Sequence, residues 1–235
     1  MLSIFKREMK SYFFSATGYV FLAVFYLFSG FFFYETSILS RNADLKYVFS
    51  NLLIILIFLI PMLTMKLISE DKKLKTEQLL LTSPVSLYSI VIGKFLAALT
   101  TLTFGVLITL VFAGVLSYFA SFDWLAYVCN VIGILLLSSA LISIGIFISS
   151  LTENQIISVV ASCAIILLLF FIDAISSNIN ISFISKALSY LSIVQPYNDF
   201  TYGAFSLPSV ILFLGLTFTF LFLTARILEK RRWAD

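Results

Sequence analysis

Long runs of apolar residues, separated by short polar stretches, dominate the pattern along the 235-residue chain. A helix needs about 20 mainly apolar residues to cross the ~30 Å hydrocarbon core of a bilayer, because each residue adds about 1.5 Å. The period-2 alternation of a membrane β-barrel is absent, so the pattern predicts an all-α protein with six transmembrane helices. The predicted spans run approximately from Gly18 to Leu39, Val48 to Ile68, Tyr88 to Tyr118, Trp124 to Ser150, Gln155 to Ile175 and Pro208 to Leu228.

The composition also indicates an integral membrane protein. Its mean hydropathy is +1.08 and only 11% of its residues are charged, whereas about a quarter of the residues of a soluble domain carry charge. Little sequence remains once the spans are counted. We therefore expect one integral membrane domain over residues 1–235, without a folded soluble domain of ordinary size.

The basic residues predict the orientation of the spans. Of the 15 lysines and arginines, all but Arg41, Lys46 and Lys186 fall in segments that an even number of spans brings to one side of the membrane. Cytoplasmic loops carry the excess of Lys and Arg. We expect both termini in the cytoplasm and the protein in the cell membrane. The net charge of +3 then reflects topology rather than binding to nucleic acid.

Residues 2–14 predict an amphipathic helix before the first span. It would turn Ile4, Phe5, Met9 and Tyr12 toward lipid and place its basic side chains among the headgroups. The basic residues of this interfacial helix are Lys6, Arg7 and Lys10. The alternative is a basic tail without regular structure.

A second short helix is expected on the extracytoplasmic side, between spans 5 and 6. Over residues 183–194, Ile184, Leu188 and Leu191 recur at helical spacing opposite serine and lysine side chains. This helix should end before Gln195-Pro196, because proline disfavours the α conformation in the residue before it. An ordinary surface loop is the alternative interpretation.

Several kinds of chemistry are excluded or disfavoured. The chain has no histidine, which rules out histidine-based triads and HExxH zinc sites. Cys129 and Cys163 lie in different predicted spans and are typical of buried apolar positions rather than of a metal or redox pair. Ile92-Gly93-Lys94 lacks the first glycine and the Ser/Thr of a phosphate-binding loop. We expect no catalytic residue, no metal site and no cofactor bound by this chain.

One dense polar patch, residues 69–94, interrupts the apolar pattern. The stretch from Ser69 to Lys75 is charged, whereas Thr76 to Leu81 forms a short amphipathic helical segment that Ser83-Pro84 ends. Ser86 has the residue type and position of the N-cap of span 3. A solvated loop is the alternative, but three consecutive leucines would leave apolar surface in water, which suits the membrane surface or a docked partner.

Helix-packing motifs occur inside the spans. Ser139/Ser143 and Gly145/Ser149 are pairs of small residues that permit close helix approach. Pro61 is expected to kink span 2, because it removes one backbone donor. Thr152 and Gln155 fit a capping box that would fix the start of span 5.

These residues together resemble a known family, the ABC-2-type permeases of ATP-binding-cassette transporters. The run Ser69-Glu70-Asp71-Lys72-Lys73, then Thr76 to Pro84 (TEQLLLTSP), then Ile92-Gly93-Lys94 is similar to the cytoplasmic element of that family. Leu151 to Gln155 resembles its second cytoplasmic turn. Asp199-Phe200 with Gly203, and the ending Leu228 to Trp233, are similar to the branch that includes the permease of the gliding-motility-associated transporter.

The resemblance implies a permease subunit that forms an export pathway and is driven by a separate cytosolic ABC ATPase. In the family, a coupling helix seats in a groove of that ATPase, which binds the ATP and magnesium, and two permease protomers rock between inward- and outward-open states. The residues that match the ATPase-coupling element are Glu70, Asp71, Lys72, Lys73, Thr76, Glu77, Gln78, Leu79, Leu80, Leu81, Thr82 and Pro84. The second cytoplasmic turn would comprise Thr152, Glu153, Asn154 and Gln155. The expected partners are the ATPase, a second identical or homologous permease chain, and membrane lipid.

Two other classes of protein are kept as alternatives. An ion-coupled carrier or channel would be expected to place charge near the bilayer midplane or to break its helices with Gly and Pro, and Pro61 is the one such sign. A non-transporting structural membrane subunit would need neither feature. A neighbouring reading frame with a Walker A motif would favour the transporter.

Overall fold

The computed structural model describes residues 1–76, 86–119, 121–178 and 192–232. Within these ranges the chain is helical and contains no strand. Residues 34–39 form a π-helical turn, η1, that continues α2, and Met65 separates α3 from α4. The elements are α1 (Leu2–Phe14), α2 (Ala16–Phe33), η1 (Tyr34–Leu39), α3 (Lys46–Thr64), α4 (Lys66–Lys73), α6 (Leu87–Val106), α7 (Ile108–Phe119), α8 (Trp124–Leu151), α9 (Gln155–Asn178), α11 (Val194–Thr201) and α12 (Leu207–Arg232).

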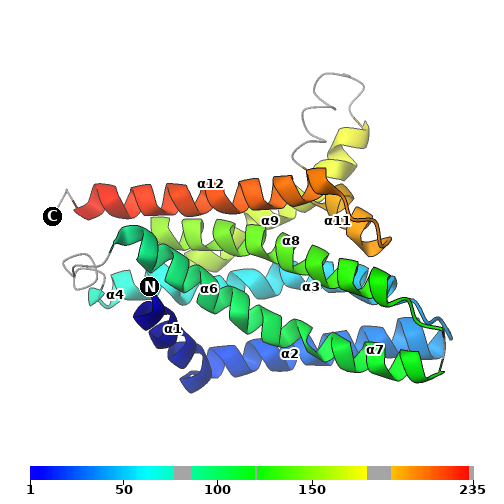
Figure 1. Cartoon of the computed structure of the whole chain (residues 1–235). Helices are drawn as coiled ribbons and strands as arrows, with labels where there is room; N and C mark the ends of the chain where they lie inside the picture. The colour runs from blue at the N-terminus through cyan, green and yellow to red at the C-terminus, as the bar shows by residue number, and fades with distance from the viewer. Residues whose placement is uncertain (77–85, 120, 179–191, 233–235) are drawn as a thin grey trace.

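Six of the helical stretches are long and apolar enough to span a membrane, which confirms the predicted fold class. They form an elongated bundle with both termini and α4 at one end, which we call the terminal end (Figure 1). The opposite, distal end carries the α2–α3 and α7–α8 connections and α11. The spans cover Ala16–Leu39, Lys46–Lys73, Leu87–Phe119, Trp124–Leu151, Gln155–Ile172 and Leu207–Arg232.

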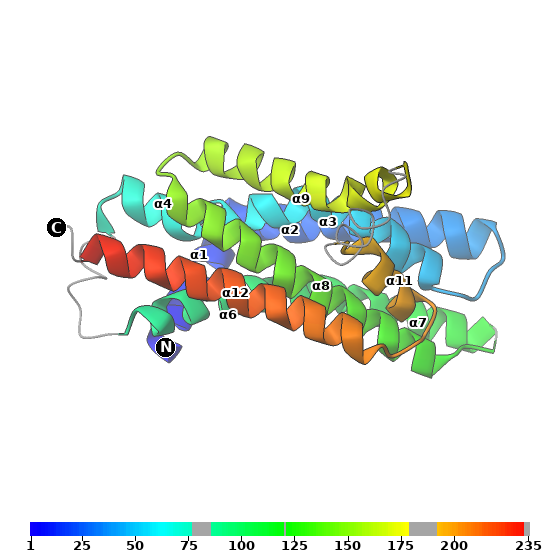
Figure 2. The same cartoon turned by 90° about the horizontal axis from the view of Figure 1, so that it is seen from above.

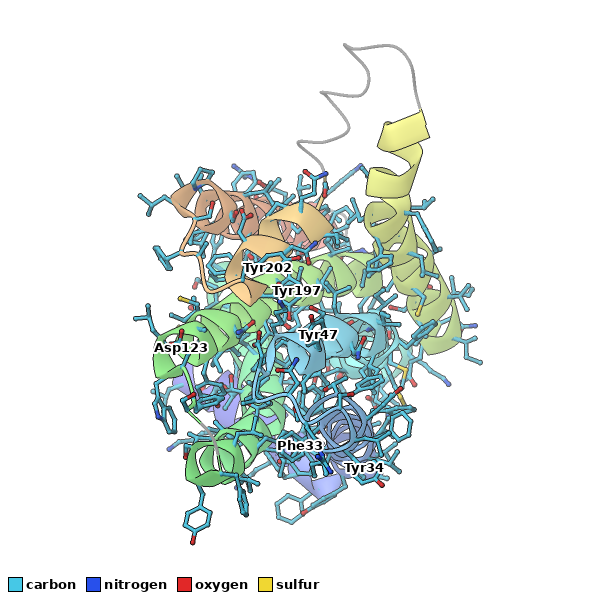
Figure 3. The ribbon with its side chains drawn as sticks, turned by 90° about the vertical axis from the view of Figure 1, so that its right-hand side faces the viewer. Phe33, Tyr34, Tyr47, Asp123, Tyr197 and Tyr202 are labelled. Carbon is cyan, nitrogen blue, oxygen red and sulfur yellow. The ribbon has the colours of Figure 1, made fainter. Side chains whose placement is uncertain are left out.

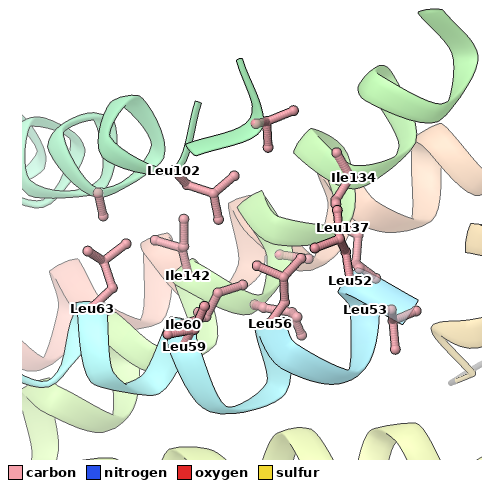
Figure 4. Packing of buried hydrophobic residues seen from close by; sticks show 14 of the residues in the cluster. Leu52, Leu53, Leu56, Leu59, Ile60, Leu63, Leu102, Ile134, Leu137 and Ile142 are labelled. Atoms are coloured by element: carbon pink, nitrogen blue, oxygen red, sulfur yellow. The ribbon is translucent and has the colours of Figure 1, made fainter. Parts of the chain in front are cut away.

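Helix α8 forms the centre of the bundle, with α3, α6, α9 and α12 packed around it (Figure 2). In the most apolar window of α8, 72% of the residues are buried, against 17% for α9 and 22% for α12. Leucine and isoleucine side chains of α3 meet those of α8 and Leu102 of α6 (Figure 4). The outer helices therefore expose broad apolar faces, as expected for helices whose solvent is lipid.

Helix α3 runs through Pro61 and ends at Thr64. Proline has no N–H, so the carbonyl of Ile57 lacks its usual donor from the following turn. Cys163 Sγ of α9 lies 3.8 Å from that oxygen and donates to it. Cys163 is thus a small, partly buried residue beside the proline, and both cysteines are free.

The apolar face of α1 is directed differently from the prediction. Ile4 and Tyr12 are only 6% and 5% exposed, because α1 packs against α6 and α2 instead of turning this face to lipid. Ile4 sits over Gly93, where a Cβ would lie 3.1 Å from its Cγ2, and the Tyr12 hydroxyl donates to the Leu63 carbonyl at 2.9 Å. An amphipathic pattern alone does not distinguish a lipid surface from a protein groove.

Ser192 and Ile193 are not helical, and a helix that was not predicted follows them. Helix α11 begins at Val194 and carries Pro196 in its first turn, where a missing N–H costs nothing because that donor has no intrahelical partner. Most of the expected helix over residues 183–194 lies outside the described residues. Two further details were not predicted: the π-turn after α2 and the break at Leu107 that divides α6 from α7.

Candidate coupling site

The described part of the polar patch lies at the terminal end, where α4 continues from α3. Ser86 caps α6 as predicted, with its Oγ accepting from the Ser89 N–H at 3.3 Å. The predicted coupling helix falls almost wholly outside the described residues, which include Thr76 but not the rest. The coupling candidates that lie outside are Glu77, Gln78, Leu79, Leu80, Leu81, Thr82 and Pro84.

Ser149 of α8 supplies the cap that α4 lacks in its own sequence. The N-cap residue of α4 is Met65, which has no capping side chain. Ser149 Oγ accepts from the N–H groups of Ile68 and Ser69 at 3.2 and 3.0 Å, and it donates to the Met65 carbonyl at 3.1 Å. The first N–H groups of a helix need such acceptors. A single hydroxyl of α8 therefore fixes the point where α4 begins.

Lys72 forms a second connection between α4 and α8. Its side chain is buried, with 6% exposure, and its Nζ donates to the Ser150 carbonyl. This carbonyl belongs to the last turn of α8, where a cation is favoured by the unsatisfied carbonyls and the helix dipole. Of the predicted coupling residues, Lys72 thus points into the protein, whereas Lys73 is exposed.

A buried ionic cluster joins α1, α4 and α6. Lys94 of α6 is 2% exposed, and its ammonium group donates to Glu8 Oε1 at 2.9 Å, to Asp71 Oδ2 at 2.6 Å and to the Leu67 carbonyl. Arg7 contacts the same two carboxylates at 2.9 and 3.5 Å. An ammonium group has three N–H donors, so every donor of Lys94 has an acceptor. The positive charges of Lys94 and Arg7 balance the negative charges of Glu8 and Asp71.

The cluster also changes the properties of its neighbours on α1. Burial lowers the pKa of the Arg7 guanidinium, but the hydrogen bond and charge of Glu8, with the charge of Asp71, raise that pKa overall. Burial, followed by the charge of Glu8, raises the pKa of Tyr12 well above its ordinary value. Arg7 is therefore charged and Tyr12 neutral across the physiological range.

Asp71 connects the ionic cluster to Thr76, the last described residue before residues 77–85. The Thr76 hydroxyl donates to Asp71 Oδ1 at 2.9 Å, while Asp71 Oδ2 holds Lys94. One carboxylate thus binds both α6 and the last described residue before position 77. A displacement of Thr76 would act directly on the charged contacts among α1, α4 and α6.

The turn between α8 and α9, which was predicted to be the second cytoplasmic turn, lies beside the Lys72 contact, directly after Ser150. The capping box predicted for Thr152 and Gln155 is wrong: α9 begins at Gln155, and its cap is Asn154, whose Oδ1 accepts from the Ile156 N–H at 2.9 Å. Thr152 Oγ1 instead accepts from the Asn154 N–H at 3.1 Å, within the turn. Asparagine is as good an N-cap as threonine, so the residue adjacent to the helix takes the role. Glu153 is exposed.

Close approach of α3 and α8 positions this whole site, as the Gly145/Ser149 pair predicted. A Cβ at Gly145 would lie 2.9 Å from the Cβ of Thr64 and still nearer its hydroxyl oxygen. Thr64 is fully buried, so it has little freedom to move aside. Ser149, one turn further along α8, is thereby brought to the start of α4.

We expect Gly145→Ala to destabilise the protein by about 1–3 kcal/mol, the usual cost of overpacking a filled interior. Thermal unfolding in detergent measures the effect, and Gly215→Ala is the matched control, because nothing lies within 4 Å of a Cβ there. Equal melting temperatures for the two variants would contradict close packing at Gly145.

The sequence did not reveal every member of the site. Glu8 was overlooked because it is a single acidic residue in a basic segment, and Lys94 was not predicted to pair with an acidic residue. The signal available for Glu8 was its position, since it lies one turn from Ile4 and from Tyr12 on the same face. Ser149 was predicted only as a small packing residue.

The contacts of the site are suited to holding helices in a fixed relation. Among the described residues, no group of three or more Cys, Asp or Glu side chains is arranged to hold a metal ion. The buried charges of the cluster are paired with one another, and its hydrogen bonds connect helices. The arrangement can hold α1, α4, α6 and the end of α8 in a fixed relation, and can pass on a force applied next to Thr76.

Six helical stretches long and apolar enough to cross a membrane define a multi-pass membrane protein. The family model of the ABC-2 family transporter proteins matches residues 2–232. The chain therefore belongs to the ABC-2 transporter family, a family of membrane transport components. The comparison with curated protein sequences finds no match, and the resemblance to the gliding-motility branch stays a prediction.

Proposed function

We propose that this chain is the permease subunit of an ATP-binding-cassette exporter, driven by a separate cytosolic ATPase that contacts residues 76–85. The observation that carries the proposal is the tethering of α4. This helix is held to α8 by Ser149 and Lys72 and to α1 and α6 by Asp71. A push on the segment that follows Thr76 would move helices of the bundle together.

The described buried charges favour this mechanism over an ion-coupled carrier. Among the Lys, Arg, Asp and Glu side chains in the described parts of the spans, the buried ones are Lys72 and Lys94. Both lie toward the terminal end, and both bind protein oxygens. A carrier needs an ionisable group that is free to exchange its ion near the midplane, whereas these groups hold helices together. The energy for transport is better supplied through a partner.

Membership of the family and the exposed helix faces support the remaining features of the proposal. The ATPase would bind the ATP and magnesium, and two permease chains would face each other across the pathway. Helices α9 and α12 expose most of their apolar windows, which gives surface for lipid and for a second permease chain.

Purification from native membranes tests the proposal. The tagged chain should retain a cytosolic protein with a Walker A motif, identified by mass spectrometry, in roughly stoichiometric amount. Repeated isolation of the chain without any ATPase, under conditions that preserve known complexes of this kind, would overturn it.

The orientation is a separate prediction, with the terminal end in the cytoplasm. In a background without Cys129 and Cys163, single cysteines at Lys73 or Lys230 should be protected from an impermeant thiol reagent in intact cells, whereas one at Asn42 should react. Permeabilised cells supply the control for reactivity. Labelling at Lys73 in intact cells would reverse the topology and remove the site from the cytosol.

A further inference from the structure

Two hollows at the distal end have no role in the proposed coupling. The first has a volume of about 340 Å³ and is lined by the α2–α3 connection, the start of α8 and α11, including Lys46, Asp123, Asn130 and Tyr202. Figure 3 looks onto this end, where Tyr47 and Tyr202 lie close together and Asp123 lies to one side. The second has a volume of about 400 Å³ and is mainly apolar. Ala43 lines both.

The polar hollow contains a buried acceptor without a partner. Asn130 is 2% exposed, and its Oδ1 makes no hydrogen bond. The orientation of the amide is fixed, because Nδ2 donates to the Ala126 carbonyl at 2.8 Å, so the free atom is the carbonyl oxygen. A buried polar atom in this state is costly. A ligand with a hydrogen-bond donor could satisfy Asn130 Oδ1.

The charged side chains around Asn130 suit a ligand that carries one positive and one negative group. Asp44 and Asp123 supply carboxylates to the lining of this hollow. Lys46 Nζ lies between the Tyr47 and Tyr202 rings, 4.9 and 5.2 Å from their centroids. Its nearest described carboxylate oxygen, on Asp44, is 3.8 Å away, which is a loose pair of the kind that contributes little. Lys46 is therefore available to bind an anion.

The second hollow has the properties of a site for an acyl chain and its ester linkage. Phe33, Val115, Leu116 and Phe119 give it apolar walls. Ser37 also lines it, is 3% exposed, and has an Oγ without a hydrogen-bond partner. A buried hydroxyl in an apolar cleft can donate to an ester carbonyl. A polar hollow beside an apolar one matches an amphiphile.

We propose that the two hollows form one binding site for a membrane lipid with a primary-amine headgroup, of the phosphatidylethanolamine class. The ammonium group donates to Asn130 Oδ1 within reach of the acidic side chains, and the phosphate binds Lys46. The ester region meets Ser37, and one acyl chain lies along the walls formed by α2 and α7. This site is independent of the ATPase, so it stands or falls separately from the proposed function.

The test compares two lipids that differ only in whether the headgroup nitrogen carries hydrogen atoms or methyl groups. Phosphatidylethanolamine and phosphatidylcholine with identical acyl chains have the same net charge, but the trimethylated headgroup has no N–H. Each lipid is titrated into the detergent-solubilised protein, and binding is measured by native mass spectrometry. We expect the amine lipid to bind roughly two- to tenfold more tightly, the range for one hydrogen bond. Equal affinities for the two lipids in the unmodified protein would overturn the proposal.

Single substitutions identify the residue that is responsible for the preference for phosphatidylethanolamine. Asn130→Leu should abolish the discrimination between the two lipids and leave the weaker affinity for phosphatidylcholine. Ser138→Ala is the matched control, because Ser138 is also a buried, unpartnered polar residue of α8 but does not line the hollow; it should keep the preference. Ser37→Ala should weaken the binding of both lipids equally. A preference that persists in Asn130→Leu would contradict the assignment, and the comparison in the unmodified protein decides the matter even if that variant does not fold.

Discussion

Replacing Lys94 by methionine is expected to lower the free energy of unfolding by about 3–5 kcal/mol, the usual cost of removing one partner from a buried ion pair. The substitution keeps the length of the side chain but removes the ammonium group. Glu8 and Asp71, whose side chains are 10% and 17% exposed, would retain Arg7 as their one described cationic partner. The Leu67 carbonyl would lose its donor as well. Thermal or denaturant-induced unfolding in detergent measures the change.

Two comparisons make this test specific. Lys73→Met removes an exposed lysine of α4 and should change stability by no more than about 0.5 kcal/mol. The triple variant Glu8→Gln, Asp71→Asn, Lys94→Met removes the unpaired charges and should regain part of the loss, since neutral groups are cheaper to bury than charges. If Lys94→Met is as stable as Lys73→Met, the ionic cluster does not hold the helices together.

Replacing Leu80 and Leu81 by serine should abolish co-purification of the ATPase. In the proposed function these leucines anchor the segment after Thr76 in a groove of the partner, and apolar anchors dominate the energy of such interfaces. Each leucine lost from a buried position removes about 1.5–3 kcal/mol, so together they should weaken the complex by about two orders of magnitude or more. Affinity purification followed by quantification of the retained ATPase measures the effect.

The folded membrane domain should be unaffected by that double substitution. Its melting temperature in detergent should match that of the unmodified chain, because the changed residues lie outside the six spans. Reversing the charge at Glu77 should have a smaller effect that depends on salt, as expected for a contact at the rim of an interface. Full retention of the ATPase by the double serine variant would show that the segment is only a solvated loop.

The spans could be predicted from the sequence because a lipid environment imposes a simple requirement of length and apolarity. The close approach at Gly145 was also predictable, since small residues at helical spacing have few other uses in a membrane helix. The Ser86 cap follows from local chemistry of the same kind. In each case the determining interactions lie within one helix or depend on the size of one residue.

The parts that were missed depend on contacts between distant residues. Lys94 lies 86 positions from Glu8 and 23 from Asp71, and no local pattern joins the three. The apolar pattern of α1 would suit lipid equally well, and the contacts of Ile4 with Gly93 and of Tyr12 with Leu63 place this face against the protein. At Asn154 two capping patterns overlapped, and the residue next to the helix took the role. The cap that Ser149 provides for α4 comes from another helix, which no rule for a single helix can find.

Site-specific photo-crosslinking in living cells tests the central claim most directly. A photoreactive residue is introduced at Gln78, in the segment proposed to bind the ATPase, and in a second strain at Asn42, at the distal end of the bundle. Proteins that become attached on illumination are identified by mass spectrometry. The proposed coupling predicts that position 78, and not position 42, captures an ATPase with a Walker A motif. Capture of only lipid or other membrane proteins at position 78, or of the same ATPase from both positions, would contradict it.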